Sequence, residues 1–107
     1  MLFQVNTDSS IDGREALTDQ VETMLQERFS RYSDRLSRIE VHLGDVNGDR
    51  GGPGDKRCMI EARPKGLDPI AVVQEAATIE QAVGGAAAKI ISALEKTFGK
   101  LTSRKGH

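Results

Sequence analysis

Two segments near the middle of the chain alternate apolar and polar side chains, and this pattern constrains the fold most. In the segment 37–43, one side would carry Ile39, Val41 and Leu43 and the other Arg38, Glu40 and His42. Residues 56–63 repeat the alternation, with Cys58, Ile60 and Ala62 on one side and Arg57, Met59, Glu61 and Arg63 on the other. This period of two is typical of β-strands that face a core on one side and water on the other. The sequence therefore predicts a sheet with one covered face and one open face.

Apolar residues at steps of three and four predict two helices that could cover this sheet. The first, from about Asp12 to 33–34, has the stripe Leu17, Val21, Met24, Leu25, Phe29 and Tyr32. The second, from about Thr78 onward, has the stripe Ile79, Val83, Ala86, Ala87, Ile90, Leu94, Phe98 and Leu101. Asp12 followed by Glu15 has the form of a capping box, and Thr78 is a preferred N-cap residue. Gly84 and Gly85 interrupt the second stripe, and we expect another backbone to pass close to them.

Two shorter strands complete the predicted order. Residues 2–6 would place Phe3 and Val5 on the buried side, whereas the apolar run in 69–75 does not fix which face is buried. The glycine-rich residues 44–55 predict a long, mobile hairpin loop, and residues 64–66 predict a turn. The order β-α-β-β-β-α predicts an α+β fold: a four-stranded mixed sheet with two helices on one face. A right-handed crossover makes the first two strands parallel, and hairpins make the others antiparallel.

The length of 107 residues fits one domain, which we place at residues 1–101, followed by a frayed tail at 102–107. No apolar run approaches the roughly 20 residues that a membrane span needs. The first six residues lack the pattern of a signal peptide. Cys58 is the only cysteine, so an internal disulfide is excluded. These features predict a cytoplasmic protein without membrane contact.

The formal net charge of −1 hides a strong segregation of charge along the chain. Residues 1–27 carry −5, residues 28–38 carry +3, residues 39–80 carry −3 and residues 81–107 carry +4. Such segregation can steer a charged partner even when the total is near zero. Acidic residues early in the first helix and arginines late in it also suit the helix dipole, which is a purely structural explanation for part of the pattern.

The sequence offers no convincing catalytic or metal-binding constellation. His42 is expected to face away from Cys58, and His107 lies at the terminus, so no histidine can activate the thiol. The segment 45–56 resembles the start of a calcium loop, but Arg50 stands where a glycine should turn the chain and Lys56 where a carboxylate should bind the ion. Carboxylates such as Glu40 and Glu61 lie among arginines, which indicates a salt-bridge ladder. We expect no enzyme activity, no cofactor and no small-molecule substrate.

The basic residues are the remaining candidate site. Three share one face of the second helix: Lys89, Lys96 and Lys100. Three more lie near the end of the first helix: Arg28, Arg31 and Arg35. We expect these six side chains to converge into one strip that contacts phosphate, with Lys56, Arg57 and Arg63 on the open sheet face as second choices. Because the three phenylalanines are assigned to the core and only Tyr32 lies at its margin, we expect recognition of RNA shape and backbone rather than of bases.

Three stretches of the sequence resemble the ribosome hibernation-promoting factors, a family that includes the ribosome-associated inhibitor proteins. They are 34–43 (DRLSRIEVHL), the hairpin pair ending in 69–72 (PIAV), and 79–90 (IEQAVGGAAAKI). The likeness covers roughly residues 1–101. In the last helix the family usually has a tyrosine, an aspartate and an Asp-Lys pair, where this chain has Glu80, Gly84 and Ala88-Lys89.

The resemblance implies a double-stranded-RNA-binding-like fold. It also implies a short-form, non-catalytic regulator that docks on the small ribosomal subunit and its rRNA and silences idle ribosomes. The family's long-form dimerisation domain has no counterpart here, so the resemblance does not imply that the protein pairs ribosomes through such a domain. We expect a monomer or a weak homodimer. Two alternatives stay open: a protein-interaction or self-associating module that uses the open sheet face, with Met59 amid charges, and a small-ligand binder under the 44–55 loop.

Overall fold

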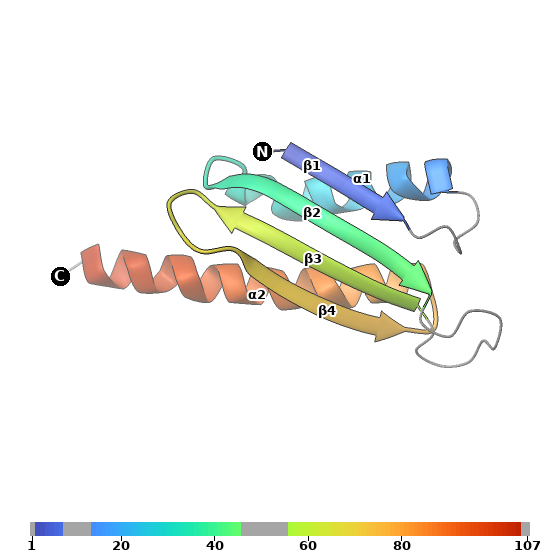
Figure 1. Ribbon diagram of the computed structural model, residues 1–107. Coiled ribbons are helices and arrows are strands. Elements are labelled where there is room, and N and C mark those ends of the chain that lie inside the picture. The colour runs from blue at the N-terminus through green and yellow to red at the C-terminus, as the bar shows by residue number, and fades with distance from the viewer. Residues whose placement is uncertain (1, 8–13, 46–55, 106–107) are drawn as a thin grey trace.

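The chain folds into two layers, a four-stranded sheet and a pair of helices (Figure 1). The computed structural model describes residues 2–7, 14–45 and 56–105, except for the side chains of Arg14 and of residues 100–105. The elements are β1 (Leu2–Thr7), α1 (Arg14–Phe29), the 3-10 helix η1 (Ser30–Tyr32), β2 (Leu36–Asp45), β3 (Lys56–Pro64), β4 (Ile70–Ala76) and α2 (Ile79–Lys105). The proposed cap at Asp12 and the loop at 46–55, with its resemblance to a calcium loop, fall outside the described residues.

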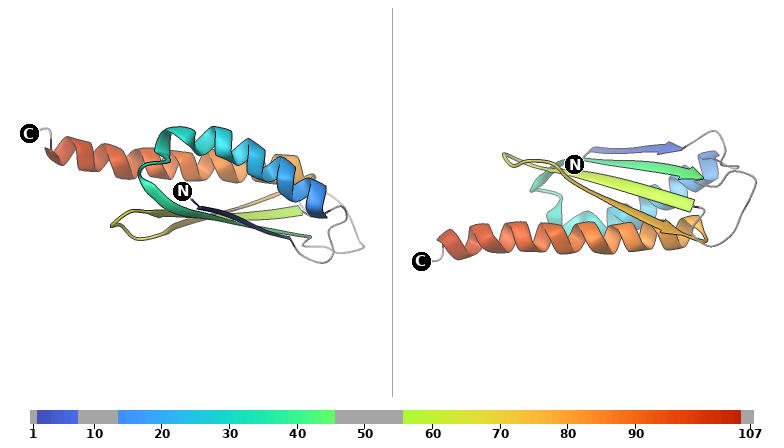
Figure 2. Two further views of the ribbon diagram at one scale, coloured as in Figure 1. Left: turned by 90° about the horizontal axis from the view of Figure 1, so that it is seen from above. Right: turned by 60° about the horizontal axis from the view of Figure 1, so that its bottom comes forward.

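The strands lie in the order β1-β2-β3-β4. β1 pairs with β2 in parallel, and the other two pairs are antiparallel. Both helices cover the same face of the sheet (Figure 2), with α1 against β1 and α2 against β3 and β4. The predicted α+β fold is confirmed. Within the described residues, neither helix combines the length and apolar character that crossing a membrane requires.

The core lies between the sheet and the helices, and the alternation in β2 and β3 produces it. The inward side chains of these two strands are almost completely buried: Ile39, Val41, Leu43, Cys58, Ile60 and Ala62. The helices contribute Val21, Leu25, Phe29, Ala82, Val83, Ala86, Ala87, Ile90, Leu94 and Phe98. Burying these side chains is the main favourable term in the stability of a domain of this size. In β4, whose orientation the sequence left open, Ile70 and Val72 pack against this core.

Helix α2 begins where the sequence predicts and continues further. The Thr78 hydroxyl accepts a hydrogen bond from the backbone N–H of Gln81 at 3.1 Å, so the predicted N-cap is confirmed. The helix continues to Lys105, four residues beyond Leu101, into the tail that the sequence predicted to be frayed. Helix α1 instead ends at Phe29, and η1 carries the chain to Tyr32.

The two glycines in α2 have different surroundings. A Cβ at Gly84 would meet nothing within 4 Å. A Cβ at Gly85 would come within 2.7 Å of Cγ in the Gln74 side chain on β4. The expectation of a close backbone therefore fails at Gly84, and at Gly85 the nearest atoms belong to a side chain. What Gly85 accommodates is a side chain from the edge strand.

Candidate nucleic-acid-binding surface

The two helices run side by side in the same direction, which places their charged ends together (Figure 2). Leu17 of α1 and Ile79 of α2 line one hollow near the two N-termini, whereas Tyr32 meets Phe98 towards the other end. Acidic residues occupy the N-terminal end: Glu15, Asp19, Glu22 and Glu80. At the opposite end, which we call the basic end, lie Arg28, Arg31, Arg35, Lys65 and Lys96, all of them exposed. Exposed carboxylates also lie at the basic end, Asp34 beside Arg35 and Asp68 in the turn that follows Lys65, so the segregation seen in the sequence is only partial in space.

The three predicted arginines do not share one helix. Arg28 lies in the last turn of α1, Arg31 lies in η1, and Arg35 follows in the turn before β2. Arg31 and Arg35 both contact α2, through Glu95 and Phe98, and the Tyr32 ring packs on Phe98 with centroids 5.7 Å apart. Tyr32 is only 7% exposed, so its predicted position at the margin of the core was wrong. We call Arg28, Arg31 and Arg35 the arginine cluster.

Arg31 is held by a carboxylate from the other helix. Its guanidinium forms an ion pair with Glu95, and the same carboxylate accepts a hydrogen bond from the Tyr32 hydroxyl at 3.3 Å. The guanidinium also lies 4.9 Å from the centre of the Tyr32 ring. The hydrogen bond with Tyr32, and then the charge of Glu95, raise the pKa of Arg31 above its ordinary value. Arg31 keeps its positive charge, but Glu95 partly neutralises it.

Arg35 is held in a different way. Its guanidinium carbon lies 3.7 Å from the centre of the Phe98 ring, and within the described residues it forms no ion pair. Cation–π contact fixes the position of the group without cancelling its charge. Arg28 is also exposed and has no ion-pair partner among the residues described. Two of the three arginines can therefore offer a full charge to an anion.

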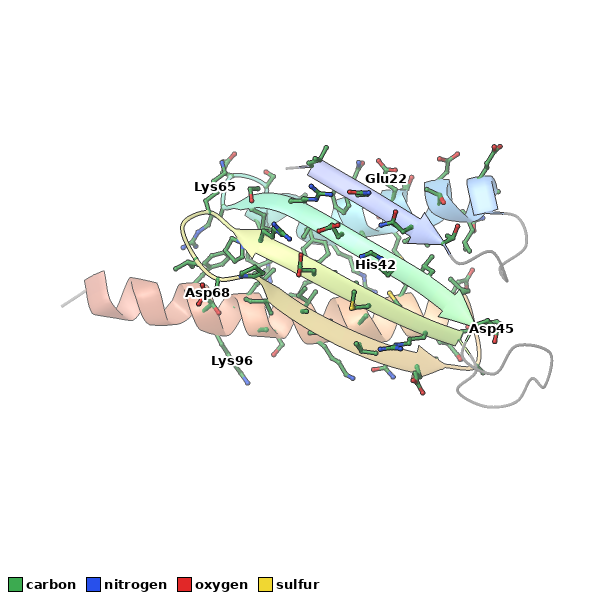
Figure 3. All side chains as sticks on the ribbon, in the orientation of Figure 1. Glu22, His42, Asp45, Lys65, Asp68 and Lys96 are labelled. Atoms are coloured by element: carbon green, nitrogen blue, oxygen red, sulfur yellow. The ribbon has the colours of Figure 1, made fainter. Side chains whose placement is uncertain are left out.

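The predicted lysines lie along α2, and Lys89 contacts the edge strand β4. The Lys89 ammonium donates a hydrogen bond to the backbone carbonyl of Val73 at 2.9 Å. Lys96, seven residues further along, projects from α2 on the side away from α1 (Figure 3). Lys100 continues the same line in the helix, and its side chain lies outside the described part. We call Lys89, Lys96 and Lys100 the lysine flank.

Lys89 and Glu95, the partner of Arg31, lie on different flanks of α2, about 120° apart by the shorter way around the helix. Lys89 contacts β4, whereas Glu95, six residues later and so about 240° further around the helix, contacts Arg31. Part of the helix surface therefore separates the two groups, and their convergence into one strip stays a prediction. Between the two groups lies the outer surface of α2, where Ser92 and Gly99 are exposed and uncharged. A polyanion that reached both groups would have to cross this surface.

The second-choice residues on the sheet are less available than expected. Lys56 does not lie on the open face. Side chains alternate along β3, so Lys56 lies on the same side of the sheet as Cys58 and Ile60, which point towards the helices. Its ammonium forms an ion pair with Asp45 at 3.0 Å. Arg57 does lie on the open face and is exposed.

Arg63 belongs to the predicted salt-bridge ladder, which is confirmed. It contacts Glu61 on its own strand at 3.0 Å and Glu40 on β2 at 3.7 Å. Arg38 lies opposite Arg63 and contacts Glu40 at 3.3 Å. Two arginines and two glutamates thus neutralise one another on this part of the sheet.

The other half of the open face is partly apolar. His42, Met59 and Val73 lie side by side on β2, β3 and β4, because the register pairs His42 with Met59 and Met59 with Val73. Val73 is 37% exposed. His42, Met59 and Arg57 also line a shallow hollow of about 340 Å³. We call His42, Met59 and Val73 the apolar row.

Cys58 is a core residue. Its thiol is completely buried, and burial raises its pKa to about 12, so it stays protonated near neutral pH. His42 is exposed on the opposite face of the sheet. Within residues 2–7, 14–45 and 56–105, no three histidine, cysteine or carboxylate side chains gather where they could hold a metal ion.

Comparison with known proteins gives a family and a fold. Residues 5–102 match the family model described as Sigma 54 modulation protein / S30EA ribosomal protein. A ribosomal subunit interface protein from Coxiella burnetii superposes with a TM-score of 0.74 at 19% identity, covering 92% of this chain and 99% of the other. The N-terminal domain of Thermus thermophilus Protein Y gives a TM-score of 0.70 at 21% identity, with coverage of 91% and 99%. A search by sequence among curated proteins gave no match.

Proposed function

The chain belongs to the Sigma 54 modulation protein / S30EA ribosomal protein family, and on this premise we propose that it is a non-catalytic regulator of translation. It binds the small ribosomal subunit through contacts with rRNA phosphates and promotes the hibernation of idle ribosomes. The family membership agrees with the resemblance to hibernation-promoting factors noted in the sequence. A ribosomal partner would place the protein in the cytoplasm.

The observation that carries the proposal is the presence of uncompensated cations at one end of a molecule whose net charge is −1. Within the described residues, Arg28, Arg35 and Lys96 are exposed and form no ion pair, and all three lie at the basic end. Phosphate oxygens favour such groups because binding releases the counterions condensed on RNA. The acidic end repels the same polyanion, so the charge distribution also orients the protein as it approaches.

The departures from the family pattern leave the lysine flank unchanged. Glu80, Gly84 and Ala88 are spaced four residues apart on α2, and Ala88 lies two turns before Glu95. They therefore share the side of α2 that faces α1. Lys89 contacts β4, and Lys96 lies seven residues later on the same side of α2, which differs from the side that faces α1. We rank Arg28, Arg35, Lys89 and Lys96 first as phosphate contacts, followed by Arg31 and Lys100, and we place Lys56, Arg57 and Arg63 last.

Co-sedimentation with purified small subunits across a salt series tests the proposal. Phosphate contacts predict binding in dilute salt that weakens steeply as the salt concentration rises. The triple variant K89E/K96E/K100E should lose most of this binding. Absence of binding by the wild-type protein at the lowest salt concentration would reject the proposal.

The apolar row on the open sheet face favours a second function, a protein-interaction or self-associating module. A Met59→Asp/Val73→Asp double variant places charge in this row without changing the basic end. If the sheet face is the functional surface, this variant loses partner capture or self-association while the triple lysine variant keeps it. If the basic end binds RNA, the two variants behave in the opposite way in the co-sedimentation assay.

A further inference from the structure

A hollow at the basic end combines features that phosphate binding alone does not need. It has a volume of about 400 Å³ and is lined by Arg31, Tyr32, Arg35, Glu95, Phe98 and Gly99. The hollow is shallow and open to solvent, so it could contact one side of a ligand without enclosing it. Its floor consists of aromatic rings, and its sides carry two guanidinium groups and a carboxylate.

The rings themselves are not accessible. Tyr32 is 7% exposed and Phe98 is 6% exposed, so neither can receive a base directly. Arg35 covers Phe98 at 3.7 Å, and Arg31 covers Tyr32 at 4.9 Å. Both arginines are exposed, so each guanidinium is accessible to solvent although it lies against a ring. Exposed guanidinium planes are surfaces on which unpaired RNA bases stack.

Glu95 gives the hollow a preference for ligands that donate hydrogen bonds. Its carboxylate is held by Arg31 and by the Tyr32 hydroxyl, and its side chain remains 55% exposed. An ionised carboxylate only accepts hydrogen bonds. It therefore suits the exocyclic amino group of cytosine, adenine or guanine and disfavours uracil, which presents the O4 acceptor there.

We propose that this hollow binds one unpaired RNA base that carries an exocyclic amino group, with the base stacked on Arg35 and its amino group donating to Glu95. This inference deepens the proposed function and rests on it. It revises the expectation of pure backbone recognition, because the stacking surface comes from arginines held by buried rings. Phosphate contacts from Arg28 and Lys96 would hold the strand on either side.

The test measures binding of short single-stranded oligocytidine and oligouridine by fluorescence anisotropy at low salt. The wild-type protein should bind oligocytidine more tightly. Arg35→Lys keeps the charge but removes the plane, so it should weaken oligocytidine binding by about fivefold or more, the size of effect seen when one base stack is removed. Arg38→Lys is the matched control: Arg38 lies on the open sheet face, pairs with Glu40 and is not among the proposed RNA contacts, so this variant should bind like the wild type.

Glu95→Gln provides an independent measurement. The amide can donate a hydrogen bond to uracil O4, so this variant should reduce or reverse the preference for oligocytidine over oligouridine. Equal binding of the two oligomers by the wild type, an unchanged Arg35→Lys variant, or no binding of either oligomer would each overturn the inference. A protein that fails this test but co-sediments with small subunits would leave the proposed function intact.

Discussion

Replacing one exposed basic side chain that forms no ion pair should reduce the salt dependence of ribosome binding by the contribution of one phosphate contact. Lys96 is exposed at the basic end and forms no ion pair within the described residues. Each phosphate that a protein neutralises contributes about 0.9 to the slope of log K against log salt on duplex nucleic acid and about 0.7 on single strands. Lys96→Gln should therefore lower the magnitude of the slope by roughly 0.7–0.9.

The same arithmetic gives the change in affinity. Between about 50 and 200 mM salt, one phosphate contact accounts for roughly a threefold loss of binding. The wild-type protein should lose about three times more affinity over this range than Lys96→Gln does. Fluorescence anisotropy with labelled protein and purified small subunits measures both slopes.

Arg63→Gln is the control for this experiment. Arg63 carries the same charge as Lys96, but Glu61 and Glu40 already neutralise it at 3.0 and 3.7 Å. Its replacement should leave the slope nearly unchanged. A fall in slope for Arg63→Gln as large as that for Lys96→Gln would refute the reasoning, because ion pairing would then not decide which cations bind. An unchanged slope for Lys96→Gln would refute it as well.

Three further predictions concern stability. Gly84→Ala should raise the melting temperature by about 2–8 °C, since alanine gains about 0.5–1 kcal/mol in a helix and its Cβ meets no atom; Gly85→Ala should gain less because Gln74 must move, and circular dichroism measures both. Leu94→Ala should lower the free energy of unfolding by about 2–5 kcal/mol in urea titrations, because the side chain is completely buried. The Cys58 thiol should react with a thiol reagent at pH 8 only on unfolding. Because burial raises its pKa from 9.0 to about 12, its contribution to stability is complete below about pH 9 and is lost as the pH rises, an effect that Cys58→Ala should remove.

Much of the fold follows from local patterns. The alternation around Ile39 and Ile60 fixes which face of β2 and β3 is buried, and Thr78 marks the start of α2 by a hydrogen bond to a nearby residue. The end of α1 was harder to predict. Phe29 and Tyr32 are three residues apart, and a 3-10 turn satisfies that spacing as well as an α-helix does.

The candidate site depends on contacts that no local pattern encodes. Arg31 is neutralised by Glu95, 64 residues later, and Tyr32 is buried only because Phe98 of α2 packs on it. The sequence therefore located the cations but not their partners. The position of Lys56, in contrast, could have been predicted from the sequence. Lys56 lies two residues before Cys58 in an alternating strand, so both side chains point towards the helices.

The helix dipole explains only part of the charge segregation. Its effect falls off within the first and last turns of a helix, so it accounts for Arg28 in the last turn of α1. Lys89 and Lys96 lie more than two turns before the end of α2 at Lys105, and Arg35 lies outside both helices. Stability of the helices does not require positive charge at these three positions. Among the cations at the basic end, Arg35 and Lys96 are therefore the two whose positive charge is best explained by a role in binding a polyanion.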